Sequence, residues 1–189
     1  MEIWEQILLD AEAGAKALIA EFGDRLFGAA VLLYRDAAAA EDLVFRTFEL
    51  AIDRIGQYHS NLPFWNWLYS IMLNRFRMDM RKQKAFVPED ATFVADMLET
   101  EGVESFCNQL MEADAAMVRE AVERLPPPFR ETVVLRYFED KTLQEMSELM
   151  VVPTGTVKWR LHQARTGLKR MLSELFNGKE EKGNELSGI

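Results

Sequence analysis

The sequence predicts an all-α protein of two small helical domains, and three features of the 189-residue chain support this fold class. Along most of the chain, apolar residues recur every three or four positions, which places them on one face of a helix. Residues 88–111 carry several acidic side chains and no lysine or arginine, a pattern typical of a solvated linker. The flanking segments, 1–87 and 112–176, are each long enough for a small core. The tail over 177–189 has little to bury and is expected to be disordered.

The first domain is expected to begin with helical structure over Ile3–Arg35, where apolar residues keep helical spacing. Asp36 suits the N-cap of a further helix, because an aspartate side chain can accept hydrogen bonds from backbone N–H groups of the first turn. That helix runs to about Arg54, and Gly56 follows where glycine commonly ends a helix. Its buried side would be formed by Leu43, Thr47, Leu50 and Ala51.

A polar loop over Gln57–Pro63 leads into a segment that is aromatic at its start and basic at its end. The residues expected in the core repeat at intervals of three and four, and they are Phe64, Trp67, Leu68 and Ile71. Trp65 and Asn66 lie off this stripe. Five basic residues then oppose a single acidic residue, Asp79, and they are Arg75, Arg77, Arg81, Lys82 and Lys84. Aromatic side chains beside a basic stretch are what single-stranded DNA binding requires, since bases stack on rings and cations hold the backbone.

The second domain is expected to open with a helix over Glu112–Arg124, which Leu125 and the three prolines after it would end. The segment Thr142–Leu172 then predicts two helices joined by a short turn. Residues 151–153 form that turn, because the proline at its end disfavours helix before it and suits the start of the next helix. A short helix, a tight turn and a longer helix make a helix-turn-helix, which lays its second helix in the DNA major groove.

The second helix of this motif has two contrasting faces. Its apolar stripe is formed by Val157, Leu161, Ala164, Leu168 and Met171. The opposite face carries Lys158, Trp159, His162, Gln163 and Thr166, with Arg160 and Arg165 on its flanks. The motif as a whole is basic although the chain has a net charge of −9. Local positive charge that opposes the overall sign predicts a phosphate partner.

No pattern in the sequence indicates an enzyme, a cofactor or a metal site. His59 and His162 lie far apart, and the single cysteine, Cys107, has no basic residue near it in sequence that would activate its thiol. No apolar run approaches the roughly 18 residues of a membrane span, and the acidic N-terminus is unlike a signal peptide. We expect a cytosolic protein that is not inserted in a membrane.

Residues 125–165 contain a dense series of short motifs. They are Leu125-Pro126, Leu135-Arg136-Tyr137, Leu143 with Glu145, Pro153, Gly155-Thr156-Val157-Lys158, Arg160-Leu161 and Ala164-Arg165. This series resembles region four of bacterial sigma factors in the extracytoplasmic-function (ECF) group of the sigma-70 family. The match is far more specific than a generic helix-turn-helix.

The N-terminal half carries two further motifs, AEDLVFRTFELAI and FWNWLYSIMLN. In order, the matching residues are Asp42, Val44, Thr47, Phe48, Phe64, Trp67, Leu68, Ile71 and Asn74. These motifs resemble sigma region two. Phe45 and Arg46 replace the usual Gln-Glu pair of the family, and Met78 occupies a place often held by aspartate, with Asp79 one residue later.

The resemblance implies a sigma factor that binds the clamp and flap of core RNA polymerase, promoter DNA and an anti-sigma factor. The minus-35 element would be bound by Thr156, Lys158, Trp159, Arg160, His162, Gln163 and Arg165. The minus-10 element would be bound by Asn61, Trp65, Asn66, Asn74, Arg75, Arg77 and Arg81. The clamp would contact Asp42, Phe45, Arg46, Glu49 and Asp53.

Two alternatives remain open from the sequence. A stand-alone helix-turn-helix regulator would bind duplex operators without polymerase, and its N-terminal half would sense a signal or dimerise. A degenerate sigma factor would only titrate an anti-sigma partner or polymerase, and the unusual Phe45 and Arg46 are the features that favour it.

Overall fold

The computed structural model describes residues 2–34, 36–59, 63–82 and 115–186, with side chains described as far as Glu174. Every regular element in these ranges is helical, which confirms the predicted all-α class. The chain divides into two compact units, Met1–Phe86 and Val87–Ile189, each with its own core. The predicted linker over 88–111 lies outside the described residues, as does Cys107. None of the described helices combines the length and apolar character needed to cross a membrane.

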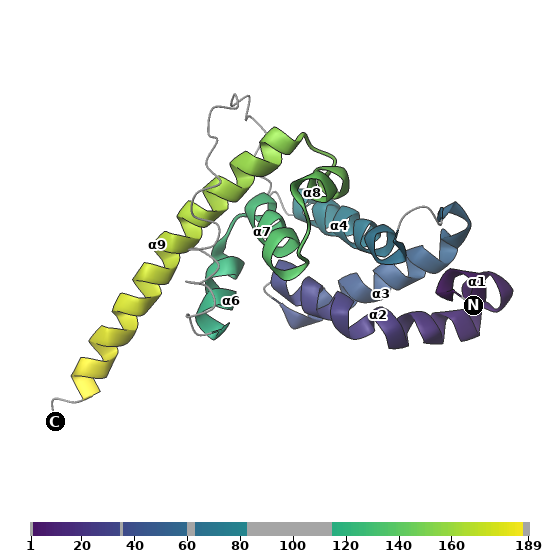
Figure 1. The fold of residues 1–189 in the computed structure, drawn as a ribbon. Helices are drawn as coiled ribbons and strands as arrows, with labels where there is room; N and C mark the ends of the chain where they lie inside the picture. The colour runs from purple at the N-terminus through teal and green to yellow at the C-terminus, as the bar shows by residue number, and fades with distance from the viewer. Residues whose placement is uncertain (1, 35, 60–62, 83–114, 187–189) are drawn as a thin grey trace. The chain divides into compact units, whose positions relative to one another are not determined.

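The described part of the N-terminal unit contains four α-helices and a short 3₁₀ turn (Figure 1). They are α1 (Ile3–Leu9), α2 (Ala11–Leu33), α3 (Ala37–Asp53), η1 (Ile55–Gln57) and α4 (Phe64–Lys82). Helix α2 packs against α1 and α3, and α3 packs against α4. The core is formed largely by leucine and aromatic side chains, among them Leu18, Leu26, Leu33, Leu43, Leu68, Tyr69 and Phe76.

Two aspartates cap the N-termini of α2 and α3. The Asp36 side chain accepts a hydrogen bond from the Ala39 backbone N–H at 3.0 Å, so its predicted N-cap role is confirmed. The helical region predicted over residues 3–35 is divided at Asp10, whose carboxylate accepts from the N–H groups of Glu12 and Ala13 and caps α2. Gly14 permits the tight fold-back of α1 on α2, because a Cβ there would lie 2.4 Å from the Ile7 Cα.

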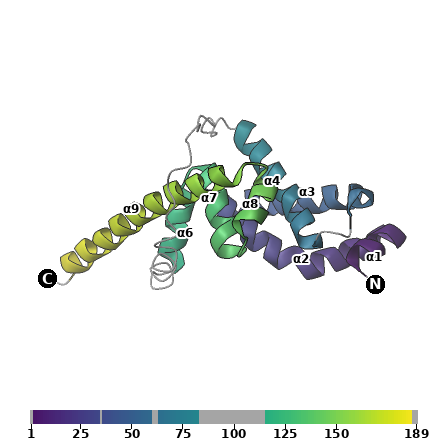
Figure 2. The ribbon, with the colours of Figure 1, turned by 45° about the horizontal axis from the view of Figure 1, so that its top comes forward.

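The C-terminal unit contains α6 (Ala115–Arg124), α7 (Pro127–Val133), the π-helical turn η2 (Val134–Phe138), α8 (Leu143–Met150) and α9 (Thr154–Leu186). Helices α6, α7 and α8 all pack against α9, which continues beyond them in both ribbon views (Figure 1, Figure 2). The predicted apolar stripe of α9 is confirmed, since Val157, Leu161, Ala164, Leu168 and Met171 are all buried.

Local contacts define the ends of the shorter helices in this unit. Pro127 occupies the first turn of α7, and the buried Arg130 donates from Nη2 to the carbonyls of Glu123 (2.7 Å) and Leu125 (2.9 Å). Thr142 and Glu145 form a reciprocal capping box at the start of α8. Val151 ends α8 in the left-handed region, with φ 55° and ψ 46°.

The tail differs from the sequence-based expectation. Disorder was predicted over 177–189 because little apolar surface is available there, whereas α9 continues to Leu186. Residues 179–182 are Lys-Glu-Glu-Lys, and these residue types have high intrinsic helix propensity. A helix already established by packing can therefore extend into this segment, because each added residue contributes one further backbone hydrogen bond.

Candidate functional site

The outward face of α9 presents polar side chains opposite the buried stripe. Lys158, His162 and Gln163 are exposed, as the helical spacing predicts. They follow one another at intervals of four and one, so they form a patch about one turn long. Thr156 lies in the first turn of α9 and is half-buried. Backbone N–H groups at this end of a helix favour an anion such as a phosphate.

Arg165, on the flank of this patch, is held by an aromatic side chain from η2. Its Nε donates a hydrogen bond to the Tyr137 hydroxyl oxygen at 2.8 Å, and both residues are half-buried. Because Nε is used in this contact, the orientation of the guanidinium plane is fixed within the unit. From the sequence Tyr137 was identified as part of a family motif, and its contact with Arg165 was missed, because helical spacing does not relate residues 28 positions apart.

Two residues predicted to face DNA are placed differently in the structure. Arg160 is only 6% exposed, so its predicted place on an accessible flank is wrong. It lies three residues after Val157 and directly before Leu161, and it is covered together with that stripe. The Trp159 ring packs edge-on against Phe129 at 5.6 Å between centroids and is half-buried. This tryptophan therefore packs sideways on its own unit.

Fewer basic side chains of the helix-turn-helix are accessible and unpaired than the sequence indicated. Lys141 is 8% exposed and lies 3.8 Å from the Glu145 carboxylate. Arg170 lies 3.8 Å from the Glu174 carboxylate on an exposed part of α9. The accessible positive charge nearest the start of α9 is therefore Lys158.

One face of α4 carries most of the residues predicted to bind the minus-10 strand. Asn66 and Arg77 are half-buried, whereas Asn74 and Arg81 are exposed. At about 3.6 residues per turn, the intervals of eight, three and four that separate Asn66, Asn74, Arg77 and Arg81 keep them on one side of the helix. Arg77 donates from Nη1 to the Asn74 side-chain oxygen at 3.1 Å. Asn61, from the same predicted set, lies outside the described residues.

The prediction that Trp65 lies off the buried face is wrong. Trp65 is only 7% exposed, and its ring stacks on Phe22 with 5.8 Å between centroids. Arg25 covers the ring from α2, with its Cζ 4.0 Å from the centroid. The periodicity of α4 alone cannot reveal this, because the covering residues belong to α2.

A cluster of half-buried aromatic rings lies where the polar loop joins α4. Tyr58 and Phe64 meet at 5.1 Å, and each of these rings lies 5.4 Å from Trp67. Trp67, which the spacing placed in the core, is thus partly exposed within this cluster. Ring surface that a base could stack on is therefore offered here by Trp67 and its neighbours and not by Trp65.

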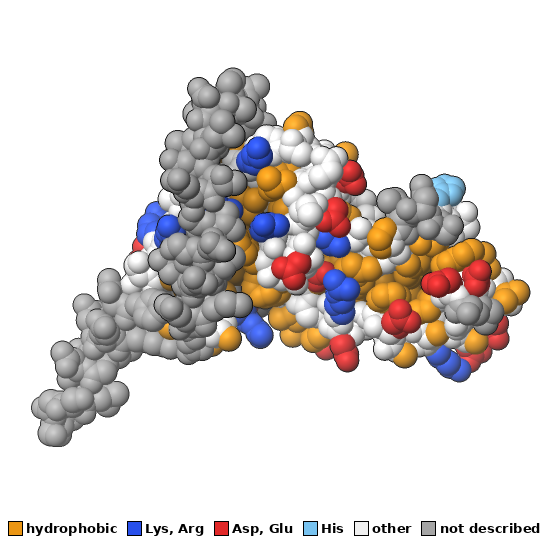
Figure 3. Space-filling model, in the orientation of Figure 1, with side chains coloured by type: hydrophobic (Ala, Val, Ile, Leu, Met, Phe, Trp, Pro, Cys, Tyr) orange, Lys and Arg blue, Asp and Glu red, His pale blue; other side chains and the backbone are white. Residues whose placement is uncertain are grey.

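The outward face of α3 carries the five residues predicted to contact the polymerase clamp. Asp42, Glu49 and Asp53 are exposed, and the Phe45 side chain is 64% exposed. Arg46 forms a two-point contact with Asp42, with distances of 2.8 Å from Nη2 and 2.9 Å from Nε to its carboxylate oxygens. In the space-filling view, hydrophobic side chains reach the surface of this unit alongside acidic ones (Figure 3).

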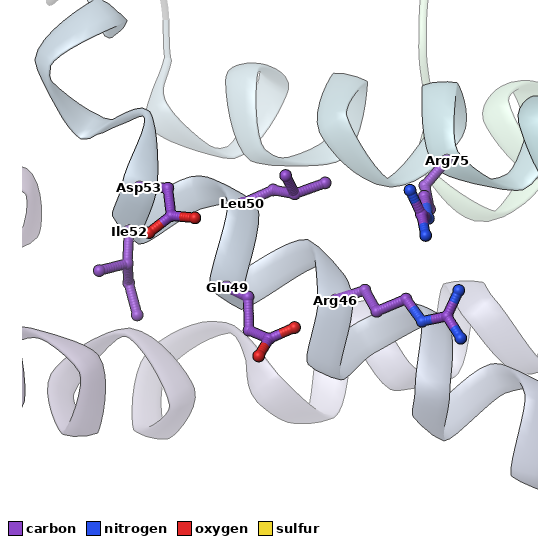
Figure 4. Close-up of a pocket in the computed structure, with 6 residues that line it drawn as sticks. All are labelled: Arg46, Glu49, Leu50, Ile52, Asp53 and Arg75. Atoms are coloured by element: carbon purple, nitrogen blue, oxygen red, sulfur yellow. The ribbon is translucent and has the colours of Figure 1, made fainter.

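A groove of about 530 Å³ runs between α3 and α4. It is lined by Arg46, Glu49, Leu50, Ile52, Asp53 and Arg75 (Figure 4). The prediction grouped Arg75 with the minus-10 residues of α4, whereas the structure places it in this groove with the residues of α3. Nine residues, or about two and a half turns, separate Arg75 from Asn66, so the two lie on opposite sides of α4.

Asp79 on α4, one residue after the place where the family often has aspartate, contacts a residue at the end of another helix. The Tyr34 hydroxyl donates to the Asp79 carboxylate at 3.0 Å and thereby joins the end of α2 to α4. Burial, together with the negative charge of Asp79, raises the pKa of Tyr34 well above its usual 10.0. Met78, at the place often held by aspartate, is 48% exposed. Within the described residues, no group of three or more His, Cys, Asp or Glu side chains could hold a metal ion.

Comparison with known proteins shows that the N-terminal and C-terminal parts of the chain both match regions of one protein family. Residues 18–86 match the family described as Sigma-70 region 2, and residues 115–168 match Sigma-70, region 4. The ECF RNA polymerase sigma factor EcfG of Rhodopseudomonas palustris is 30% identical over 156 residues, covering 82% of this chain and 81% of that protein. The ECF RNA polymerase sigma factor SigW of Bacillus subtilis is 27% identical over 165 residues, covering 82% and 86%.

Two solved structures have a similar fold. CnrH in complex with the cytosolic domain of CnrY matches with a TM-score of 0.62 at 22% identity, covering 91% of this chain and 96% of that one. The sigma factor RpoE of Bartonella quintana, in complex with the anti-sigma factor NepR, matches with a TM-score of 0.62 at 22% identity, covering 84% and 96%. Together with the matches to regions 2 and 4, the relationship to EcfG establishes that the chain belongs to the sigma-70 family of RNA polymerase sigma factors, in the ECF group.

Proposed function

We propose that the two units of this sigma factor divide the binding of polymerase and promoter between three helix faces. As an ECF sigma factor, the chain binds core RNA polymerase and directs promoter-specific initiation of transcription. Helix α9 reads the minus-35 element, α4 holds the melted minus-10 strand, and α3 docks on the polymerase clamp. The polymerase supplies the catalysis, and the chain acts in the cytoplasm.

The observation that carries the minus-35 assignment is the outward patch of α9. Lys158, His162 and Gln163 are exposed on one face, while the opposite face is buried against α6, α7 and α8. A helix supported in this way presents a rigid polar surface to the major groove, where lysine and glutamine can bind base edges. In this proposal Arg165 and the first turn of α9 hold phosphates, which fix the register but carry no sequence information.

The minus-10 assignment is supported by the single face of α4 that carries Asn66, Asn74, Arg77 and Arg81. A melted strand needs ring surface for unstacked bases and cations for its backbone. The cluster of Tyr58, Phe64 and Trp67 supplies ring surface where α4 begins, and Arg77 and Arg81 supply cations further along. Trp65, whose ring is covered by Phe22 and Arg25, supports the fold of this region.

The docking assignment is supported by the exposed face of α3. Phe45 offers a large apolar side chain at 64% exposure, beside the charged residues Asp42, Glu49 and Asp53. An exposed aromatic residue surrounded by charges is typical of the anchor of a protein interface. Since the RpoE structure contains an anti-sigma factor, we include regulation of this chain by an anti-sigma factor in the proposal.

Run-off transcription tests the proposed function directly. Core polymerase would be incubated with the full chain and a library of promoter fragments, and transcripts would be sequenced to recover the selected elements. We expect transcripts that depend on the chain and share a minus-35 and a minus-10 element. Arg119→Ala, a charge-matched control on the exposed face of α6, should select the same elements.

The two alternatives give different results in the same assay. A stand-alone regulator would bind duplex DNA in a mobility-shift assay without polymerase and would produce no chain-dependent transcripts. A titrating protein would bind core polymerase or an anti-sigma factor, yet it would select no promoter at any concentration. Either result would reject the proposed function.

A further inference from the structure

The groove between α3 and α4 contains a cation that the promoter-binding face of α4 does not use. Arg75 enters the groove from α4, about half a turn away from Asn66 and Arg77. Its Nε is buried and has no hydrogen-bond partner in the structure. A buried donor that lacks an acceptor costs stability, so its presence calls for an explanation.

The two arginines of the groove differ in their pairing. Arg46 is already engaged by Asp42 through two short contacts, whereas the Arg75 Nε lacks a partner. A guanidinium presents several N–H donors in a planar fork, and this fork matches the two oxygens of a carboxylate or phosphate. Arg75 is half-buried and lines the groove, so the accessible part of its guanidinium group can bind an anionic group that arrives from outside the chain.

The other charges of the groove distinguish between these two anions. Glu49 and Asp53 are exposed and line the same groove (Figure 4). A nucleic acid strand would bring a row of phosphates past these carboxylates, and like charges repel at short range. A protein segment can instead combine one acidic side chain with basic or apolar neighbours, so the groove favours a protein carboxylate over a DNA phosphate.

We propose that Arg75 binds an aspartate or glutamate of the polymerase segment that docks on α3. This inference rests on the proposed docking of α3 and specifies the chemistry of its partner. Arg46 and Asp53 are seven residues apart on α3, which corresponds to about 10 Å along the helix axis. The docking segment thus places an acidic side chain at Arg75 and a basic one near Asp53, while Leu50, Ile52 and the exposed Phe45 contact its apolar side chains.

The test measures the affinity of the labelled full chain for core polymerase in the absence of DNA. We expect Arg75→Ala to weaken binding about tenfold or more, because a carboxylate would lose its charged partner. Arg75→Lys should fall between the wild type and Arg75→Ala, since it keeps the charge but not the planar fork. Lys82→Ala, an exposed charge-matched control on α4, should bind like the wild type. Circular dichroism would verify that each variant keeps its helical content.

A second measurement separates docking from a DNA contact. With enough Arg75→Ala to saturate core polymerase, promoter opening should return to the wild-type level; a persistent defect at saturation would overturn the inference. Alanine substitutions of acidic residues on the polymerase clamp, each combined with Arg75→Ala, should identify one residue whose loss has no further effect. If no acidic residue couples to Arg75, the carboxylate assignment is wrong.

The outcome also distinguishes this inference from the proposed docking of α3, on which it rests. If Phe45→Ala weakens core binding while Arg75→Ala and Arg75→Lys do not, α3 docks as proposed and only the role of Arg75 is rejected. If none of the three variants changes the affinity, the docking of α3 itself is rejected.

Discussion

The Nε of Arg165 on α9 donates to the hydroxyl oxygen of Tyr137 on η2 at 2.8 Å, across 28 residues of sequence. This contact orients a guanidinium group that flanks the outward patch of α9. Arginine side chains have many rotamers, so ordering one for phosphate binding costs entropy. A hydroxyl that holds Nε lowers this cost before DNA arrives, and Tyr137 thereby becomes a positioning residue for the minus-35 contact.

We expect Tyr137→Phe to weaken minus-35 binding about three- to tenfold, because it removes one hydrogen bond and leaves the ring in place. The loss should be equal for all minus-35 sequences, since phosphate contacts carry no base preference. Holoenzyme binding to duplex promoter fragments would measure it. The control is the same substitution combined with Arg165→Ala, which should bind no more weakly than Arg165→Ala alone. An additive loss would show that Tyr137 acts independently of Arg165.

Substitutions on the outward patch of α9 should change promoter preference. Lys158→Ala or Gln163→Ala should relax selection at particular minus-35 positions, because each base-edge contact discriminates by about 1–3 kcal/mol. Arg165→Ala should instead lower affinity uniformly and reduce the salt dependence by about one unit. Selection of minus-35 elements with each holoenzyme would separate the two patterns. Unchanged preference at every position in the Lys158 and Gln163 variants would show that α9 does not read the bases through them.

The two tryptophans at the start of α4 should behave differently on substitution. Trp65→Ala should destabilise the N-terminal unit by about 3–5 kcal/mol, since it removes a buried ring between α2 and α4. Trp67→Ala should lower the stability of this unit less than Trp65→Ala does. It should slow promoter opening, because it removes part of the exposed ring surface. Urea denaturation and permanganate reactivity of the promoter would measure the two effects. A pre-melted template should partly restore transcription by Trp67→Ala, and normal opening in this variant would exclude its role.

The contact between Tyr34 and Asp79 predicts a loss of stability at alkaline pH. The pKa of Tyr34 is raised in the folded chain from its usual 10.0, so the folded state holds its phenolic proton more tightly than the unfolded state does. The resulting stabilisation is fully present below about pH 10 and is lost as the pH rises towards the folded pKa. Urea denaturation between pH 8 and 11 would measure this slope.

Tyr34→Phe is the matched control for the alkaline effect, because it keeps the ring and removes the titrating hydroxyl. It should lower stability at pH 8 through the lost hydrogen bond to Asp79 and should show a shallower decline above pH 10. Identical slopes for the wild type and the variant would mean that other groups account for the alkaline loss.

Helical spacing predicts the buried residues of a helix best where all the helices that pack on it approach from one side. All five residues that it placed on the apolar stripe of α9 are buried, because α6, α7 and α8 pack on that stripe, whereas it did not include the buried Arg160 and Leu172. It failed at Trp65, because Phe22 and Arg25 of a different helix cover a ring that lies off the main stripe of α4. Contacts of this kind depend on how helices pack, which the spacing within one helix does not contain.

The same limit explains why the sequence did not reveal the different surroundings of three arginines. The sequence grouped Arg75, Arg160 and Arg165 as DNA contacts because all three are basic residues on the expected helices. In the structure Arg75 lines a groove, Arg160 is buried and Arg165 is bound by Tyr137. Charge identifies a candidate residue, but its role depends on the direction of a long side chain, which neighbouring helices determine.

The left-handed backbone at Val151 has a consequence for protein engineering. Valine is branched at Cβ and disfavours this conformation, yet the side chain is 80% exposed and gains little from packing. The turn between α8 and α9 therefore stores strain on the order of 1 kcal/mol, which glycine or asparagine at this position would relieve. Residue 151 lies outside the proposed polymerase and promoter contacts. Stability gained there could compensate for destabilising changes on α9, so this turn is a suitable starting point for redesigning promoter specificity.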